Sequence, residues 1–510
     1  MKKIKYILLF LAFTAVLSCK KDLEEQPYGF LSTSNFYKTG SDANAALIYA
    51  YSILPDLDYY SRNFIVLTEL PTEDVAEAAG KSADELLADQ NAVTSTNSML
   101  APAYQFPYVG INRANLVIAY VPPITNGLTD SAKNEIIGEA YCLRALHYFN
   151  LVRLFGAVPL HLTPVDDISQ TNLPKSSIQA IYTQIIADLT KAYPMMDGTQ
   201  RLGRFNKVGA WALLSKVYLE LASAKSSGSE GYDWVSDANA MYTLAQQFSG
   251  YVVNNQTVYG LDPSLTDIYD VNAKFGPEHI LDASVDRSGA DEGQYSKLPL
   301  FFYPNLNFTL APAPSAGTSA DEFIPGGFGE FLTEPGLYNS FDPNDKRKTQ
   351  LIISTIYNVG GGLDGTGPTQ QLLITGTEYR PFSNKYNDAG WIAGQQTGAN
   401  TPIIRYSDIL LVYAEACGPT TAGYAALGQI RARAGLGNIP TGLSIADFRN
   451  AVIQERSWEL CFEGNRLFDL RRSHQMESVL VTQYGKTLTG DPYFFPIPQS
   501  EVEQNPNLNN

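Results

Sequence analysis

Acidic and basic side chains crowd one stretch near the C-terminus, ERSWELCFEGNRLFDLRR at residues 455–472. Glu455, Glu459 and Glu463 stand four residues apart, so on one helix they would line a single edge. Two carboxylates carry out glycoside hydrolysis when they flank the scissile bond from opposite sides, at roughly 5–9.5 Å. Acids on one helix face point the same way, so this spacing does not favour that chemistry.

Basic residues stand three positions from these acids, a spacing that pairs opposite charges on a helix. The predicted pairs are Arg456 with Glu459, Glu463 with Arg466, and Asp469 with Arg472. A basic neighbour favours the ionised carboxylate, whereas a general acid needs a raised pKa. We therefore predict a partly buried ion network that ties the last long helix to the segment after it. The aromatic residues packed beneath it would be Trp458, Phe462 and Phe468.

The remaining motifs do not predict a catalytic, cofactor or metal site. The segment AAGKSAD at 78–84 lacks the first glycine of a phosphate-binding loop, because Val75 occupies that position. The glycines at 360–367 do not form a dinucleotide-binding pattern. The histidines at 147, 161, 279 and 474 have no metal-ligand spacing, and His147 fits a hydrogen-bonded core residue.

Apolar residues at helical spacing predict an all-α dominated fold. One block of helices is predicted over 41–54, 108–121, 130–156, 176–193, 206–225 and 237–249, and a second over 405–417, 421–437 and 444–464. Helices of similar length indicate about four tetratricopeptide-like pairs. Gly, Pro, Asn and aromatic residues dominate 251–400, where we expect ordered loops with a few short strands. Small core residues are expected at Cys142, Cys417 and Cys461.

The first residues are typical of an exported lipoprotein. A basic start, MKKIK, precedes an apolar run over 6–17 that is too short to span a bilayer, which predicts a signal peptide over 1–18. Val-Leu-Ser-Cys then matches a lipobox, so we expect Cys19 to carry acyl chains and to anchor a tether over 19–40. No later segment has the roughly 18 consecutive apolar residues of a membrane span.

The chain is acidic, with a formal net charge of −16 at pH 7. Loss of the signal peptide, which holds three lysines and no acid, makes the charge more negative still. Such a surface repels nucleic acid and anionic lipid, so we predict no nucleic-acid partner. An uncharged ligand suits this surface, because its binding needs no strong field.

Several segments together resemble the SusD/RagB family of outer-membrane lipoproteins. ERSWELCFEGNRLFDLRR resembles the hallmark C-terminal helix of that family, and RYSDILLVYAEA and LGQIRARAGL resemble neighbouring helices. EAYCLRALHYFNLVRLFGAVPL and GRFNKVGAWALLSKVYLEL are similar to N-terminal helices, and FFPIPQSEVEQNPNLNN to the tail. The residues after Cys19, KKDLEE, look like the family's export signal to the cell surface. The resemblance covers the chain from the lipobox to the C-terminus, with the motifs in the family's order.

The resemblance implies a division into an N-terminal helical part over 41–250, a loop-rich ligand-binding insertion over 251–400, and a C-terminal helical part with an extended tail over 401–510. It implies a protein without catalysis or cofactor, anchored through Cys19 to the outer membrane and facing the cell exterior. Its implied role is to bind an oligosaccharide or polysaccharide and to deliver it to a SusC-like TonB-dependent transporter.

In the family, loops from the early N-terminal part and the central insertion form the ligand site. Aromatic residues cover the apolar face of a sugar ring, and polar residues bond its hydroxyls. The expected rings are those that no helical stripe explains, namely Trp391, Tyr59, Tyr60, Tyr295, Phe301, Phe302 and Tyr303. The expected polar partners are Asp58, Arg62, Asn305 and Asn307. Trp391 has small neighbours and is expected to be the most exposed of the rings.

Three alternatives to glycan capture stay open. Some relatives handle oligopeptides, which need partners for backbone groups more than ring platforms. The chain could instead be a secreted glycoside hydrolase, or a helical scaffold for other proteins. The segment 76–100 lacks the tryptophan that some starch-binding members use, so the glycan class stays open as well.

Overall fold

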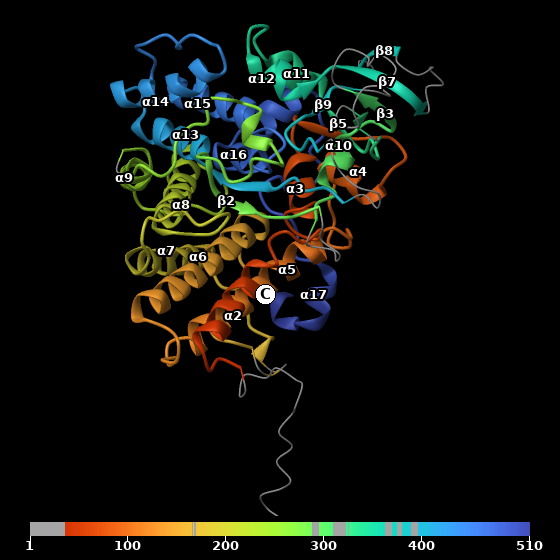
Figure 1. Cartoon of the computed structure of the whole chain (residues 1–510). Helices are drawn as coiled ribbons and strands as arrows, with labels where there is room; N and C mark the ends of the chain where they lie inside the picture. Colours follow the sequence, from red (N-terminus) through yellow and green to blue (C-terminus); the bar gives the residue numbers. More distant parts are fainter. Residues whose placement is uncertain are drawn as a thin grey trace, which may run out of the picture.

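The computed structural model describes residues 36–509 apart from 166, 168–169, 255, 288–294, 310–322, 325, 363–369, 375–379 and 389–395. Helices pack side by side along the chain and form one flank of the molecule, and the short strands lie together on the other (Figure 1). The described chain begins beside the first helix and ends beside a short C-terminal helix near it. This arrangement confirms the predicted helix-dominated fold with a few short strands.

The long helices follow the two predicted blocks. The first block comprises α2 (Gly40–Tyr51), α5 (Leu100–Tyr120), α6 (Asp130–Phe155), α7 (Ile178–Ala192), α8 (Lys207–Ser227) and α9 (Ala238–Asn254). The second comprises α13 (Tyr406–Cys417), α14 (Thr421–Arg433), α15 (Ile445–Leu460) and α16 (Arg466–Arg472), and α17 (Gln499–Gln504) follows in the tail. Successive helices pack on one another, and α13 lies against α8, α9, α14 and α15 to join the two blocks.

Side-chain caps set where these helices begin. A hydroxyl or amide oxygen directly before the helix accepts a backbone N–H of the first turn and so satisfies a donor with no partner inside the helix. The capping residues are Thr39 before α2, Thr129 before α6, Ser177 before α7, Asn206 before α8, Thr420 before α14 and Ser444 before α15.

Shorter elements fill the loops. Near the N-terminus these are α3 (Asn63–Glu69), β1 (Val75–Glu77) and α4 (Ala83–Asp89). The central insertion contains α10 (Leu298–Phe302), α11 (Pro335–Ser340), α12 (Lys346–Gln350), β2 (His279–Ala283), β3 (Leu306–Thr309), β4 (Phe323–Ile324), β5 (Phe331–Thr333), β6 (Ile352–Ile353), β7 (Thr355–Gly362), β8 (Gln370–Leu373) and β9 (Phe382–Ser383). The strand β10 (Thr401–Arg405) leads into α13.

Antiparallel pairing ties the insertion to both helical blocks. One sheet has the strand order β4-β3-β7-β8, and its inner face covers a small core of its own. The strand β1 pairs with β5, so that Glu77 lies opposite Phe331. In the same way β10 pairs with β2, with Thr401 opposite Ala283. The large core is continuous through both helical blocks, so the insertion is held on a single packed body.

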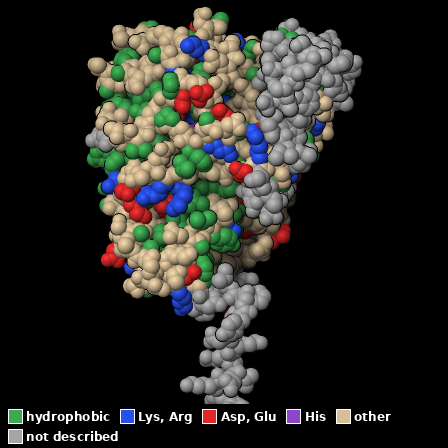
Figure 2. Space-filling model, in the orientation of Figure 1, with side chains coloured by type: hydrophobic (Ala, Val, Ile, Leu, Met, Phe, Trp, Pro, Cys, Tyr) green, Lys and Arg blue, Asp and Glu red, His purple; other side chains and the backbone are tan. Residues whose placement is uncertain are grey.

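The surface of the described residues carries mixed charges on the face in Figure 2, where acidic and basic side chains lie next to each other. In the part of the chain that the structure describes, no helix is both long and apolar enough to cross a bilayer. The cysteines Cys142, Cys417 and Cys461 are buried and free, as the apolar patterns predict.

The last long helix ends earlier than the sequence predicts. It stops at Leu460, and a turn over 461–464 reaches α16, because Phe462 and Gly464 adopt positive φ angles of 68° and 74°. Glu463 therefore leaves the helix edge that Glu455 and Glu459 share.

The conformation of the turn at Gly464 leads to a first prediction, which concerns the stability of Gly464→Ala. A Cβ at Gly464 would lie 2.7 Å from Thr68 Oγ1 and 3.0 Å from Ile65 Cδ1, in addition to the strain of its left-handed backbone. Gly464→Ala should lower the free energy of unfolding by about 2–4 kcal/mol, from strain plus overpacking. Gly442→Ala is the matched control, since its φ is also positive at 81° but nothing lies within 4 Å, and it should cost only about 1–2 kcal/mol. Urea unfolding measures both, and equal losses would contradict the close packing described here.

Candidate functional site

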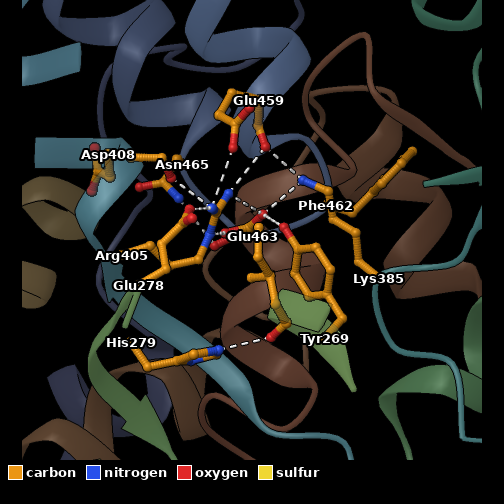
Figure 3. A network of polar contacts seen from close by, with 12 residues as sticks. Tyr269, Glu278, His279, Lys385, Arg405, Asp408, Glu459, Phe462, Glu463 and Asn465 are labelled. Atoms are coloured by element: carbon orange, nitrogen blue, oxygen red, sulfur yellow. Dashed lines mark hydrogen bonds and ion pairs between the residues drawn. The ribbon is translucent and has the colours of Figure 1, made fainter. Parts of the chain in front are cut away.

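The charged side chains of the C-terminal stretch meet around one arginine at the end of β10 (Figure 3). The Nε and Nη2 atoms of Arg405 donate to the two carboxylate oxygens of Glu463 at 2.8 and 2.9 Å. Its Nη1 pairs with Glu278 and lies 3.3 Å from Glu459. The Lys385 ammonium contacts Glu463 at 2.6 Å. The chain thus brings four distant segments to one point.

Two further arginines complete the cluster. The guanidinium of Arg433, at the end of α14, contacts Glu459 at 2.6 Å. That of Arg347, in α12, contacts Glu455 at 2.6 Å and Glu459 at 3.2 Å. All of these side chains are at most 5% exposed. The network therefore braces the insertion, β10 and α14 against α15.

A second group of ion pairs involves the residues of α16. Arg456 contacts Asp408 at 2.7 Å and Asp469 at 2.8 Å. Arg472 contacts Asp469 at 2.8 Å and also pairs with Glu415, while Arg466 pairs with Glu73. Of the three predicted pairs, only Asp469 with Arg472 forms. Glu463 with Arg466 is wrong because the turn at 461–464 redirects the chain. Arg456 with Glu459 is wrong because both side chains pair with residues of other segments.

The electrostatics of this network do not suit catalysis. Burial alone would raise the pKa of Glu459, but the guanidiniums of Arg433 and Arg405 outweigh it and hold that pKa well below its usual range. Arg405 and Lys385 lower the pKa of Glu463 in the same way. A void that reaches Glu463 holds about 20 Å³, room for a water and not for a sugar. The network is structural, and it is more fully buried than the sequence predicts.

Most of the rings expected at a ligand site are buried, which corrects that expectation. Tyr59 is 0% exposed and Tyr60 is 4% exposed, and Asn150 Nδ2 donates to both hydroxyls, at 2.7 and 2.6 Å. Tyr59 also bonds His147, 3.1 Å from its Nδ1, as expected of a core histidine. Burial, followed by the charge of Arg113, lowers the pKa of His147 to about 3 and so keeps its ring neutral.

The rings of the insertion are buried too. Their exposed fractions are 7% for Tyr295, 6% for Phe301, 3% for Phe302 and 1% for Tyr303. The Tyr303 hydroxyl accepts the backbone N–H of Asp388 at 2.9 Å and donates to Asn387 Oδ1 at 3.1 Å. Phe301 and Phe302 belong to the large core and Tyr303 to the small core beside the sheet, so the absence of a helical pattern did not mean exposure.

Arg62 is the predicted polar residue that does join the two expected parts of the site. Its guanidinium pairs with Glu85 of α4 and lies 4.6 Å from the centroid of the Phe301 ring. The Arg62 side chain is 28% exposed, whereas that of Glu85 is 1% exposed. Phe301 in turn meets the half-buried ring of Phe328 edge to face, at 5.3 Å. An N-terminal loop and the central insertion thus share one surface.

Two charged residues that sequence reasoning missed lie at the same surface. The exposed Lys81 donates from Nζ to the backbone oxygen of Phe328 at 2.8 Å. The backbone oxygen of Glu330 accepts the backbone N–H of Ala78 at 2.8 Å, next to the β1–β5 pair. We define the Arg62 cluster by its members Arg62, Lys81, Glu85, Phe301, Phe328 and Glu330. It offers hydrogen-bond donors and acceptors beside a half-buried aromatic ring.

The buried carboxyls of Glu77 and Glu85 interact with each other beside Arg62. Burial, followed by the negative charge of Glu85, raises the pKa of Glu77 to about 9. Burial also raises the pKa of Glu85, although Arg62 opposes the shift. Glu77 Oε1 accepts the backbone N–H of Ser82 at 3.1 Å, which orients the pair at the start of α4. With a pKa of about 9, Glu77 keeps its proton at neutral pH.

This pair makes a second prediction. The folded pKa of Glu77 lies above its usual 4.5, so between about pH 4.5 and 9 the folded state holds a proton that the unfolded state has lost. Stability should therefore fall as pH rises through this window. Glu77→Gln should reduce the fall in Tm between pH 5 and pH 8.5, while a change at the exposed Glu503 should not. An unchanged pH profile in Glu77→Gln would contradict the raised pKa of Glu77.

The other predicted residues are exposed, are half-buried or lie outside the described chain. Asp58 and Asn305 are exposed, and Asn307 is half-buried and accepts the backbone N–H of Gly326 at 3.1 Å. Trp391 and Cys19 lie outside the described residues, so the predicted exposed ring and lipid anchor stay predictions.

Two cavities open elsewhere on the described surface. A polar cavity of about 410 Å³ is lined by Asp267, Tyr269, Asp270, Arg287, Asn384 and Asn387. Tyr269 separates it from the ion network, because its hydroxyl donates to Glu463 Oε1 at 2.8 Å. A second cavity of about 670 Å³, here called the tyrosine groove, lies between α2, α5 and the C-terminal tail, and its lining includes Tyr49, Gln105, Tyr108, Asn112, Arg113 and Glu501. Sequence reasoning missed both, because each joins segments far apart in the chain.

Two family models match the chain in separate stretches. Residues 277–487 match a model described as "SusD family", and residues 42–219 match one described as "Starch-binding associating with outer membrane". "SusD-like protein P2" of Formosa agariphila is 27% identical over 100% of this chain and 99% of its own length.

Solved structures show the same similarity. A "Laminarin binding SusD-like protein" is 25% identical, with a TM-score of 0.74 over 92% of this chain and 98% of that one. A SusD superfamily protein from Parabacteroides distasonis is 22% identical, with a TM-score of 0.77 over 94% of this chain and 99% of that one.

Proposed function

The chain belongs to the SusD family, and from this premise we propose that it binds a glycan at the outer membrane and passes it to a SusC-like TonB-dependent transporter. The similarity over nearly the full length to a laminarin-binding SusD-like protein carries the proposal. The role is that of a binding protein and not of an enzyme, in agreement with the buried, fully paired carboxylates of the C-terminal stretch.

We assign glycan binding to the Arg62 cluster. Its members come from the N-terminal loops and from the insertion, and β1–β5 pairing holds these parts together. The Arg62 guanidinium is partly exposed and its plane is fixed by Phe301 on one side and Glu85 on another. A fixed planar donor loses little conformational entropy when it bonds sugar hydroxyls. Trp391, in the same insertion, remains a candidate ring for the sugar face.

Calorimetry against two ligand panels tests the proposal. The glycan panel contains laminarin, starch and xylan, and the peptide panel contains unrelated oligopeptides. We expect heat of binding for at least one glycan and for no peptide. Binding of peptides alone would replace the proposal with oligopeptide capture. Release of reducing ends during long incubation with the bound glycan would replace it with hydrolysis.

The membrane anchor has a test of its own. Cys19→Ala removes the only thiol at the lipobox, so the full-length chain expressed in its host should leave the outer-membrane fraction for the soluble fraction. The wild-type chain should stay in the outer-membrane fraction. A large β-barrel transporter should co-purify with it on affinity purification. Retention of Cys19→Ala in the membrane fraction would contradict lipidation at this residue.

A further inference from the structure

The tyrosine groove lies on a different part of the molecule from the Arg62 cluster. Its walls come from α2, α5, the segment after α6 and the C-terminal tail around α17, and no member of the Arg62 cluster lines it. In Figure 1, α2, α5 and α17 lie together near the C-terminus, whereas α4 and α10 lie beside the strands of the insertion. Its volume of about 670 Å³ is within the usual range for small-ligand sites.

Two aromatic rings in the groove are held in fixed positions. The Tyr108 hydroxyl donates to the backbone oxygen of Pro159 at 2.8 Å, and its ring meets the His161 ring edge to face at 5.6 Å. Tyr49 is 57% exposed, and the Arg113 guanidinium stacks on its ring at 3.8 Å. Arg113 also donates from Nη1 to the Tyr49 backbone oxygen at 3.1 Å, which ties α5 to α2 at the groove. These rings form a rigid apolar wall.

Hydrogen-bonding groups beside these rings have unused capacity. Arg113 Nε is buried and has no hydrogen-bond partner among the described residues. Asn112 Oδ1 accepts the backbone N–H of Val165 at 2.9 Å, which fixes the side chain, and within the described part of the chain its Nδ2 has no hydrogen-bond partner. Gln105 Nε2 donates to Glu501 Oε1 at 2.6 Å, and the amide oxygen of Gln105 has no donor among the described residues. Donors and acceptors are therefore both present next to the apolar wall.

The charges in the groove favour an uncharged ligand. Arg113 and Glu501 carry opposite charges, so the lining does not select an anion or a cation. A pyranose ring matches the rest, because it has an apolar face for Tyr108 or Tyr49 and hydroxyls that both donate and accept. We propose that the tyrosine groove is a second carbohydrate site, separate from the Arg62 cluster.

This inference rests on the proposed function, because it assumes that the glycan bound at the Arg62 cluster also binds in the tyrosine groove. A polysaccharide long enough to reach both sites would bind more tightly than a short oligosaccharide, because the second contact becomes intramolecular. Short oligosaccharides would fill the two sites independently.

Calorimetry with laminarin hexasaccharide and maltohexaose tests the groove on the full folded chain. The variant Tyr49→Ala/Gln105→Ala changes two exposed side chains, and Ile48→Ala is the matched control, because Ile48 is 58% exposed on α2 but does not line the groove. We expect two hexasaccharides per wild-type chain, one per Tyr49→Ala/Gln105→Ala chain, and two per Ile48→Ala chain. Affinity for the parent polysaccharide should fall at least tenfold in the double variant.

The failures of the two proposals are distinguishable. One hexasaccharide per wild-type chain, lost in an Arg62 variant and unaffected in Tyr49→Ala/Gln105→Ala, would overturn the groove and keep the proposed function. Peptide binding that the double variant removes would overturn the assignment to carbohydrate. No binding of either sugar or polysaccharide would overturn both.

Discussion

Replacing Arg405 with methionine should lower the free energy of unfolding by at least about 3–5 kcal/mol, because the variant leaves buried carboxylates without their main partner. Arg405 holds both oxygens of Glu463 and also pairs with Glu278, and all three side chains are at most 2% exposed. Folded domains are stable by only about 5–15 kcal/mol, so much of the chain should be unfolded at moderate denaturant concentrations where the wild type is intact.

Urea unfolding at pH 7 measures the effect, with two comparisons. Arg405→Lys keeps the charge but not the bidentate contact with Glu463. Its loss of unfolding free energy should therefore be smaller than that of Arg405→Met. Asp130→Asn breaks a pair whose acid is 96% exposed, and it should cost about 1 kcal/mol or less. A loss in Arg405→Met no larger than that in Asp130→Asn would show that the network does not brace the fold.

Replacing Arg62 with lysine should weaken glycan binding at least tenfold while leaving Tm nearly unchanged. Lysine keeps a positive charge beside Glu85, so the buried carboxyl stays paired. It loses the planar guanidinium that stacks on Phe301 and presents several donors in one plane. A tenfold loss corresponds to about 1.4 kcal/mol, the order expected for one or two hydrogen bonds.

Arg380→Lys is the matched control for this prediction. Arg380 is also partly exposed, at 20%, and pairs with Glu334 at 3.1 Å, but it lies outside the Arg62 cluster. Its affinity for the glycan should equal that of the wild type. Equal affinities in Arg62→Lys and the wild type would remove Arg62 from the site, and equal losses in both variants would point to a general charge effect.

The helices were predictable because apolar residues recur every three to four positions in the sequence. The predicted range 130–156 nearly equals the observed limits of α6, Asp130–Phe155, because Gly156 ends the helix. The start of α5 was missed by eight residues, because Pro107 lies inside the helix, where proline normally ends one. The end of α15 was missed because Phe462 adopts a positive φ, which only the packing around the turn can enforce.

The candidate site was less predictable because its contacts join residues far apart in the chain. Local spacing indicated that the acids of the C-terminal stretch pair with arginines, but it could not show that Arg405 and Arg433 are the partners of Glu459. Aromatic residues without a helical pattern were read as exposed, yet Tyr59 and Tyr303 are core residues of ordered loops. No sequence pattern marked Lys81 and Glu85, before and within α4, as site residues. They meet the insertion only because β1 pairs with β5.

The central claim is that the buried acids brace a protein that holds a glycan without changing it. Equilibrium dialysis against the glycan panel, followed by the size profile of the retained glycan, tests that claim most directly. We predict that a glycan is retained and that its chain length equals that of the starting material. A shortened glycan, or no retained glycan from any member of the panel, would contradict the account.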